Sequence, residues 1–255
     1  MPAPRILIDQ HLSAGVTIAL DEGQSRHLGA VLRRGAGDRV RVFNARDGEW
    51  AALIADVSKR GMKVSVEDFI RPASVAPNLD LLFAPVKRHA TDLIVEKATE
   101  LGVRRIRPII TQRTIAETVR LDRLQTIARE AAEQTERFEA PEIFEPLSLA
   151  KALDGWDASC ALIYADEAGE DERAPWGGVA GRAPPLGQAI AHLKSDRLAL
   201  LIGPEGGFTS DERKMLRALA FVNPVSLGPR ILRAETAAIA ALSVIQALWG
   251  DWREA

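Results

Sequence analysis

The chain has 255 residues, of which 47% are hydrophobic and 27% are charged, as in soluble globular proteins with one large domain or two unequal ones. Its 33 basic and 35 acidic residues give a formal net charge of −2, which argues against tight nonspecific binding to nucleic acid through bulk charge. One cysteine, Cys160, excludes an internal disulfide and is expected in the core, and four scattered histidines lack metal-ligand spacing. The scattered histidines lead us to expect no metal. From the pattern of apolar residues we expect no membrane span, no signal peptide and a cytoplasmic location.

The first 70 residues are typical of a small β-rich module. Short strands bounded by glycine and aspartate turns are predicted at residues 5–8, 16–20, 39–43, 49–57 and 62–70, with one helical piece at 25–33. The proline-bounded stretch 71–78 is poor in hydrophobic periodicity and is predicted to be a linker. This pattern predicts a first domain over residues 1–72 and a second over residues 73–255.

After the linker, apolar strand candidates alternate with helical stretches. The strands are predicted at residues 79–84, 106–110, 161–165, 198–202 and 222–227, and the helices at 91–101, 119–137, 186–194, 210–220 and 235–249. Such alternation predicts an α/β fold with a largely parallel, doubly wound sheet. The glycine- and proline-rich segment 166–187 is expected to be a mobile surface loop, either covering a site or forming a tolerated insertion.

Two glycine-punctuated turns near the C-terminus each follow a strand-like run and lead into a helix. The first is Gly203-Pro204-Glu205-Gly206-Gly207, followed by a capping-box spacing at Thr209 and Glu212, and the second starts at Leu227-Gly228. We expect the turns to end neighbouring strands at the carboxyl edge of the sheet, where open parallel sheets bind ligands. The spacing matches neither a dinucleotide fingerprint nor a phosphate loop. The alternatives are a ligand held by backbone groups and a tight structural turn.

Charged residues near these turns add candidates. Arg230, Arg233 and Glu235 gather at a predicted helix start beside the second glycine turn and form a credible site. Lys97 with Glu100, and the stripe of Glu130, Gln134 and Arg137, are typical of solvated helix faces and could also line a cleft.

Four motifs, in order along nearly the whole chain, resemble the RsmE family of 16S ribosomal RNA uridine-N3 methyltransferases in the SPOUT superfamily. They span residues 96–103, 130–137, 201–208 and 227–237, and His27-Leu28, Val31-Leu32-Arg33 and Gly37-Asp38 join them in the small domain. The resemblance implies a trefoil-knotted SPOUT domain, an N-terminal PUA-like RNA-binding β-barrel, a homodimer, and 16S rRNA within the small ribosomal subunit as substrate. It places the knot and an S-adenosylmethionine site in residues 198–250.

The resemblance also implies roles for particular residues. The cofactor-binding residues would be Leu201, Gly203, Pro204, Glu205, Gly206, Gly207, Leu227, Gly228, Ile231, Leu232, Arg233 and Thr236, and the RNA-binding residues Arg33, Arg34, Lys87, Lys97 and Arg137. Methylation at N3 requires loss of the N3 proton, so Arg233 or Arg230 would stabilise the uracil anion, and Glu205 would act as base or orient an arginine. The rivals are a SPOUT enzyme acting on another RNA or a ribose 2′-hydroxyl, and a noncatalytic RNA-binding assembly factor.

Overall fold

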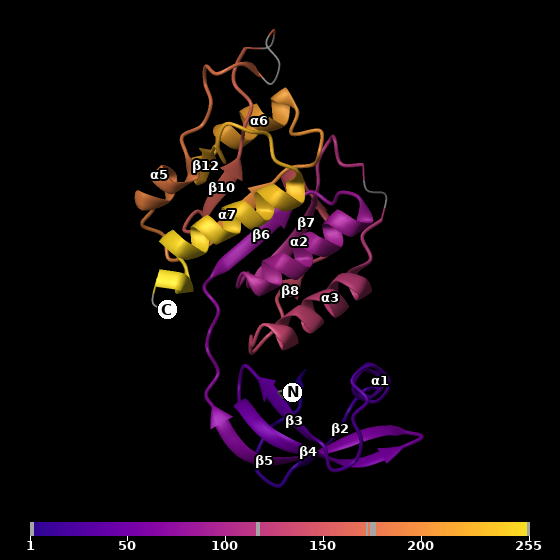
Figure 1. Cartoon of the computed structure of the whole chain (residues 1–255). Coiled ribbons are helices and arrows are strands. Elements are labelled where there is room, and N and C mark those ends of the chain that lie inside the picture. Colours follow the sequence, from indigo (N-terminus) through magenta and orange to yellow (C-terminus); the bar gives the residue numbers. More distant parts are fainter. Residues whose placement is uncertain (1–2, 116–117, 172, 174–176, 254–255) are drawn as a thin grey trace. The chain divides into compact units, whose positions relative to one another are not determined.

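A computed structural model describes residues 3–115, 118–171, 173 and 177–253 (Figure 1). The chain divides into two compact units, Met1–Val75 with Arg129–Ala140, and Ala76–Ala128 with Pro141–Ala255. The first unit thus includes a short segment from the middle of the chain. The domain boundary after residue 72 stays a prediction.

The first unit is built on a five-stranded sheet with the order β1-β3-β4-β5-β2. Its strands are β1 (Arg5–Leu7), β2 (Thr17–Ala19), β3 (Arg39–Asn44), β4 (Gly48–Ser58) and β5 (Gly61–Arg71). β1 pairs with β3 in parallel and the other pairs are antiparallel. Register shifts between β4 and β5 allow these long strands to bend and twist. The predicted helical piece is a short helix, α1 (Glu22–Arg26), followed by one π-helical turn, η1 (His27–Val31).

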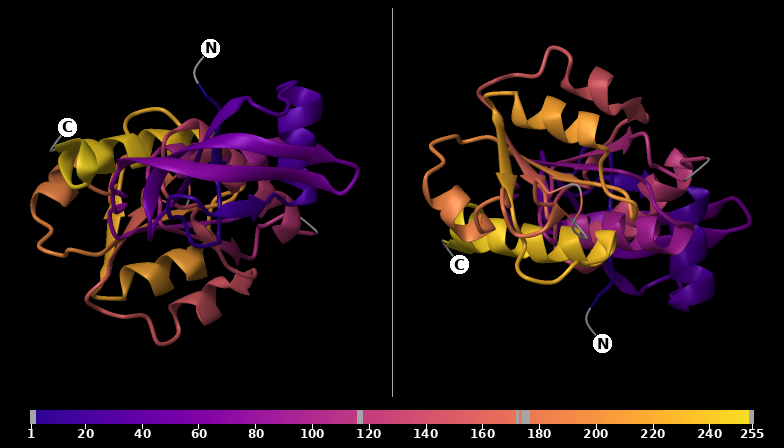
Figure 2. Two further views of the ribbon diagram at one scale, coloured as in Figure 1. Left: turned by 90° about the horizontal axis from the view of Figure 1, so that it is seen from below. Right: turned by 90° about the horizontal axis from the view of Figure 1, so that it is seen from above.

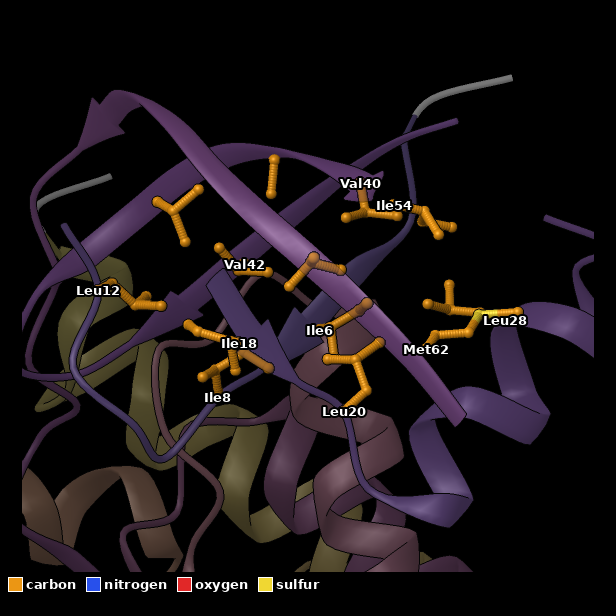
Figure 3. Close-up of a cluster of buried hydrophobic side chains, with 13 residues drawn as sticks. Ile6, Ile8, Leu12, Ile18, Leu20, Leu28, Val40, Val42, Ile54 and Met62 are labelled. Atoms are coloured by element: carbon orange, nitrogen blue, oxygen red, sulfur yellow. The ribbon is translucent and has the colours of Figure 1, made fainter. Parts of the chain in front are cut away.

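Alternate side chains of these strands form the core of the first unit, which Figure 3 shows. Successive strand residues point to opposite faces. Val40 and Val42 of β3 therefore face inward, whereas Arg39, directly before Val40, is exposed. Leu28 of η1 is buried in the same cluster. Leu28 therefore anchors the π-helical turn η1 in the core of the first unit.

A buried carboxylate joins the edge strand to the rest of the first unit. Glu49 on β4 is fully buried, and its two oxygens accept hydrogen bonds from Arg5 on β1 at 2.9 Å and from Arg71 on β5 at 2.5 Å. Burial alone would raise the pKa of the Glu49 carboxyl, but the two arginines outweigh it and hold the pKa below its usual value. The Arg5 guanidinium also lies 3.9 Å from the centroid of the Phe43 ring.

The segment Arg129–Ala140 contacts residues of β1, β3 and β5 in this unit. The backbone N–H of Leu7 donates to Glu133 at 2.9 Å, and Arg71 pairs with Glu136 at 2.7 Å. The rings of Phe43 and Phe138 meet edge to face with centroids 6.1 Å apart. These contacts explain why the end of helix α3 (Leu121–Gln134) belongs to the first unit.

The second unit contains a seven-stranded sheet in which every recorded pair of strands is parallel. Its order is β12-β10-β11-β6-β7-β8, and β9 also pairs with β7. The strands are β6 (Leu79–Phe83), β7 (Arg105–Ile110), β8 (Glu142–Ile143), β9 (Leu147–Ser148), β10 (Ala161–Ala165), β11 (Leu198–Ile202) and β12 (Val222–Val225). The predicted parallel sheet is confirmed. The expectation that the two glycine turns end neighbouring strands is wrong, because β10 lies between β11 and β12.

Helices cover both faces of this sheet, as predicted (Figure 2). One face carries α2 (Arg88–Glu100), α5 (Leu186–Ala191) and α7 (Ala234–Leu248), and the other α4 (Leu149–Leu153) and α6 (Ser210–Arg217). A one-turn 3-10 helix, η3 (Asp251–Arg253), follows α7. In the described ranges, no helix has the length and apolar character of a membrane span. The trefoil knot stays a prediction.

We expect Glu49→Gln to lower the free energy of unfolding by about 3 kcal/mol at neutral pH, because it leaves the buried Arg5 guanidinium without its counter-charge. The pKa of Glu49 is lowered in the folded state, so this stabilisation is present above the unfolded-state pKa and disappears as pH falls through the folded-state pKa. Urea denaturation over a pH series should show wild type and variant converging in acid.

The matched control is Asp122→Asn, which removes an exposed carboxylate that pairs with Arg120 at 2.7 Å. It should leave the unfolding free energy almost unchanged, since exposed pairs contribute little. A difference between wild type and Glu49→Gln that persists undiminished at the lowest pH would contradict the assignment of the effect to the Glu49 charge.

Candidate active site

Three loops leave the carboxyl edge of the parallel sheet side by side. The register aligns Tyr164 of β10 with Leu201 of β11, and Ala165 of β10 with Val225 of β12. Adjacent strands lie about 4.8 Å apart, so the two glycine turns start about 10 Å apart, with the loop that begins at Asp166 between them. Sequence reasoning named the outer two loops as cofactor-binding, and the strand order places the loop after β10 between them.

The first glycine turn has no room for a side chain at its start. A Cβ atom on Gly203 would lie 2.5 Å from Cε2 of Phe208. The Phe208 ring is itself fixed edge to face against the fully buried Tyr164, with centroids 5.1 Å apart. Gly207 has φ +68°, and its N–H donates to the Pro204 carbonyl at 2.8 Å, closing a tight turn. The turn is therefore rigid, and it leaves Glu205 and Gly206 exposed.

Glu212 joins this turn to the loop after β7. Its carboxylate accepts the Thr209 N–H at 2.9 Å in the predicted capping box, and the Gln112 N–H at 2.8 Å. Arg113 donates to the Gly206 carbonyl at 2.8 Å. Sequence reasoning found the capping box but not the partners about 100 residues earlier, because nothing in the local pattern of residues 111–114 marks them.

The second glycine turn presents its arginines to solvent. Gly228 has φ +111°, and the preceding Ser226 N–H donates to the Pro184 carbonyl at 2.8 Å. Arg233 is the N-cap residue of α7, and both it and Arg230 are exposed. Neither arginine has an ion-pair partner among the residues that the structure describes. Two such guanidinium groups can bind an anionic ligand or a developing negative charge.

The remaining predicted cofactor residues lie around the same two turns. Leu201 and Pro204 are buried, Leu227 and Leu232 are half-buried, and Ile231 and Thr236 are exposed. A Cβ atom on Gly207 or on Gly228 would meet no atom within 4 Å. Open space therefore adjoins the bare backbone of both turns, which suits a ligand held by backbone groups.

The middle loop is held by an ion-pair cluster that sequence reasoning missed. Asp166 is almost fully buried and accepts hydrogen bonds from Arg213 at 3.0 Å and from Arg217 at 2.9 Å, both on α6. The same arginines donate to backbone carbonyls of the loop, those of Ala168, Gly169 and Gly181. The i, i+4 spacing of the two arginines was a visible signal, but their partner was not. The described part of the predicted mobile loop is thus anchored at its start.

Glu167 follows Asp166 at the same edge and was not among the predicted site residues. It is half-buried, and burial together with the Asp166 charge raises the pKa of its carboxyl. A carboxylate with a raised pKa is a better base than a solvated one. Glu167 therefore joins Glu205 as a carboxylate at this edge.

The predicted RNA-binding residues do not form one group. Lys87 is exposed at the N-cap of α2, at the carboxyl edge, where the Ala84 N–H donates to the Ile202 carbonyl at 2.9 Å. Lys97 lies ten residues further, about 15 Å along the helix, and pairs with Glu100 at 2.7 Å and Glu96 at 2.8 Å. Arg33, Arg34 and Arg137 belong to the first unit.

A cavity of about 320 Å³ opens at the opposite, amino edge of the sheet, lined among others by Asp80, Arg107, Trp156 and Cys160. None of the predicted site residues lines it. Burial raises the pKa of the Cys160 thiol to about 11, so this cysteine is a core residue, as predicted, and not an activated nucleophile.

Comparisons with known proteins agree with this geometry. Residues 74–246 match the family model of an RNA methyltransferase domain, and residues 20–67 match that of an RNA methyltransferase PUA domain. The chain is therefore an RNA methyltransferase-type protein with an N-terminal PUA domain.

The chain is 31% identical to ribosomal RNA small subunit methyltransferase E of Rickettsia conorii over 98% of both chains. It is 32% identical to the Synechocystis protein of that name, over 96% of this chain and 78% of the relative. The structure of the Neisseria gonorrhoeae methyltransferase E bound to S-adenosyl methionine superposes with a TM-score of 0.82 at 28% identity, covering 98% of this chain and all of the other. The chain belongs to the ribosomal RNA small subunit methyltransferase E family, which confirms the resemblance in its motifs.

Replacing Gly203 and Gly206 separately tests the rigidity of the first turn. Gly203→Ala should lower the free energy of unfolding by about 1–3 kcal/mol, because its Cβ would overlap the fixed Phe208 ring. Gly206→Ala is the matched control, since its Cβ would meet Arg113 only at 3.5 Å, an ordinary contact. Equal unfolding free energies of the two variants in urea would show that Phe208 yields and that the turn is not rigid.

Proposed function

We propose that the chain transfers a methyl group from S-adenosylmethionine to N3 of a uridine in 16S rRNA of the small ribosomal subunit. The observation that supports this most is the pair of glycine turns at one sheet edge, open beside Gly207 and Gly228, in a chain whose family includes a structure solved with S-adenosyl methionine. S-adenosylmethionine supplies an electrophilic methyl group on a sulfonium centre. Residues 203–207 and 227–236 would hold it within a knotted region of residues 198–250.

The chain's own residues would manage charge and protons on the uracil. N3 can accept a methyl group only as its proton leaves, and negative charge then develops on the uracil oxygens. Arg233 and Arg230, exposed and without ion-pair partners in the described ranges, would stabilise that charge. Between the two edge carboxylates we assign proton removal to Glu167, whose pKa is raised, and leave Glu205 to orient an arginine.

The N3 atom lies on the pairing edge of the base, so the target uridine must be unpaired or turned out of its helix. Lys87 stands exposed at the same sheet edge and would contact the neighbouring phosphates. The PUA domain, through Arg33 and Arg34, would bind the RNA at a second place, whereas Lys97 is committed to two glutamates and is the weakest of the predicted contacts.

The working assembly would be a cytoplasmic homodimer with domains at residues 1–72 and 73–255. Helix α7 supports a second copy as partner, because Val244 and Leu248 are exposed on it and Trp252 is exposed just beyond. Val244 and Leu248 are four residues apart and therefore lie on one face of the helix, and contiguous exposed apolar patches mark protein–protein interaction sites.

We expect the purified chain to bind S-adenosylmethionine in a calorimetric titration and to methylate 16S rRNA. Arg233→Ala should lower the methylation rate at least 100-fold, by analogy with the loss of one donor to a developing oxyanion. Arg104→Ala is the matched control and should leave the methylation rate unchanged, because Arg104 is an exposed arginine directly before β7, at the amino edge of the sheet and away from the candidate site.

The readouts separate the rivals. Mass spectrometry of the digested RNA distinguishes N3-methyluridine from a ribose 2′-O-methyl group or a product in another RNA. Absence of cofactor binding by the folded wild type would favour the noncatalytic assembly factor, and full activity of Arg233→Ala would remove that arginine from the mechanism.

The role of Glu167 predicts a pH dependence. A base must be deprotonated, so the wild-type rate should fall as pH drops through the raised pKa of Glu167. Glu167→Gln should be slower than the wild type at neutral pH, with cofactor affinity within about twofold, and the two rates should converge as pH falls, because the variant lacks this acidic limb. Glu205→Gln is the matched control and should keep the limb; the reverse result would transfer the base role to Glu205.

A further inference from the structure

Two aliphatic side chains of the first unit are exposed to solvent at the end of a turn that is anchored by one buried leucine. Val31 and Leu32, at the end of the π-helical turn η1, are 64% and 38% exposed, whereas Leu28 one turn earlier is 1% exposed. π-Helical turns are rare and occur often at functional sites. The exposure of adjacent valine and leucine at such a turn calls for a binding partner.

The turn is held rigidly from beneath. The N–H of Leu32 donates to the His27 carbonyl at 3.0 Å, and that of Arg34 to the Leu28 carbonyl at 2.8 Å. Gly35 donates to the Asp38 carboxylate at 2.8 Å. Leu28 and Met62 lie side by side in the core (Figure 3). The tip is therefore presented in one shape, and its apolar side chains cannot withdraw by refolding a loose loop.

The residue after the exposed pair is backbone-strained. Arg33 has φ +54°, in the left-handed region that costs a side-chain-bearing residue stability. Glycine would adopt this conformation without that cost. A left-handed residue commonly ends a helical turn, and strained backbone also clusters at ligand-binding sites.

The charge around the tip favours a polyanion. Arg33, Arg34 and Arg39 lie on the turn or beside its core contact Val40, and Arg33 and Arg39 are exposed. Arg26 pairs with Glu22 at 3.5 Å, and Lys63 lies opposite Asp56 in the register of β4 and β5. Against these three arginines stands Asp38, which accepts the Gly35 N–H, so the tip carries a small positive excess although the chain's net charge is −2. A polyanion that also offers apolar faces is single-stranded or bulged RNA.

We propose that Val31 and Leu32 form an apolar wedge that packs against unstacked bases of the RNA, while Arg33 contacts the adjoining phosphate. The inference rests on the proposed function, and it adds a base-contacting element to a domain whose predicted contacts were arginines alone. Aliphatic side chains placed against or between bases hold RNA or DNA in an opened shape. The PUA domain would thereby recognise an irregular RNA segment and not only its charge.

The test measures binding of the full-length chain to small ribosomal subunits that lack the methyl group, over a range of salt concentrations. The double variant Val31→Ala, Leu32→Ala should bind about tenfold more weakly at every salt concentration, as expected for loss of a base contact. Its slope of log affinity against log salt should equal that of the wild type. Arg33→Ala should instead reduce the slope by about one, as for loss of one phosphate contact.

Two further variants exclude a structural explanation. Ile70→Ala, on an equally apolar and exposed position of β5 (41% exposed), is the matched control and should bind like the wild type. Arg33→Gly should bind as weakly as Arg33→Ala but melt at a higher temperature, because only glycine relieves the strain at φ +54°.

The inference is overturned if the double variant binds within twofold of the wild type, or if its melting temperature falls by several degrees. It is also overturned if the defect appears with subunits and vanishes with protein-free 16S rRNA, because the contact would then be to a ribosomal protein. Methylation of the same subunits by the wild type tests the proposed function separately. If the wild type methylates them but the double variant binds normally, the proposed function holds and only the wedge is wrong. If the wild type does not methylate them, the proposed function is wrong, whatever the binding result.

Discussion

The parallel pairing of β10 with both β11 and β12 is the constraint on which the candidate site depends. Because all three strands run the same way, their carboxyl ends meet at one edge, and the loops that follow them must lie next to one another. Residues from three separate stretches of sequence, near Asp166, Gly203 and Gly228, are brought together by backbone hydrogen bonds alone. The backbone pairing alone places the starts of these loops, and exposed side chains such as Glu205, Arg230 and Arg233 remain available for a ligand.

Helix α6 holds these loops rigidly in their positions. Its first turn carries Glu212, which bonds to both Thr209 and Gln112, and its later turns carry Arg213 and Arg217, which grip Asp166. One short helix therefore fixes the first glycine turn, the loop after β7 and the middle loop at once. The two carboxylates are buried and the two arginines half-buried, all with hydrogen-bond partners, whereas Arg230 and Arg233 in the second turn are exposed. The candidate site thus has rigid loops around Asp166 and Gly203 and exposed guanidinium groups in the second turn. Such an arrangement suits electrostatic stabilisation of a developing negative charge.

The sequence predicted the elements well where a pattern is local, and failed where the determining contact is distant. Strand and helix periods located every long element of the second unit, and the capping box gave the start of α6. The pieces of two to five residues, β8, β9 and α4, are too short to show a period. The order of strands rests on pairing between residues some 40 to 60 positions apart, so β10 was not expected between β11 and β12. The partners of Asp166 and Glu212 were missed for the same reason.

Net charge is a poor guide to where a chain can bind RNA. A value of −2 averages buried ion pairs, such as Glu49 with Arg5 and Asp166 with Arg213, together with the exposed groups that a ligand can reach. Once the buried pairs are set aside, exposed basic residues remain in several places, among them the carboxyl edge of the large sheet and the turn that ends at Arg33. Weak overall attraction would limit binding to arbitrary RNA. Under the proposed function, affinity for the substrate would then come from contacts that fit its shape, which is how a near-neutral chain could select one uridine among many.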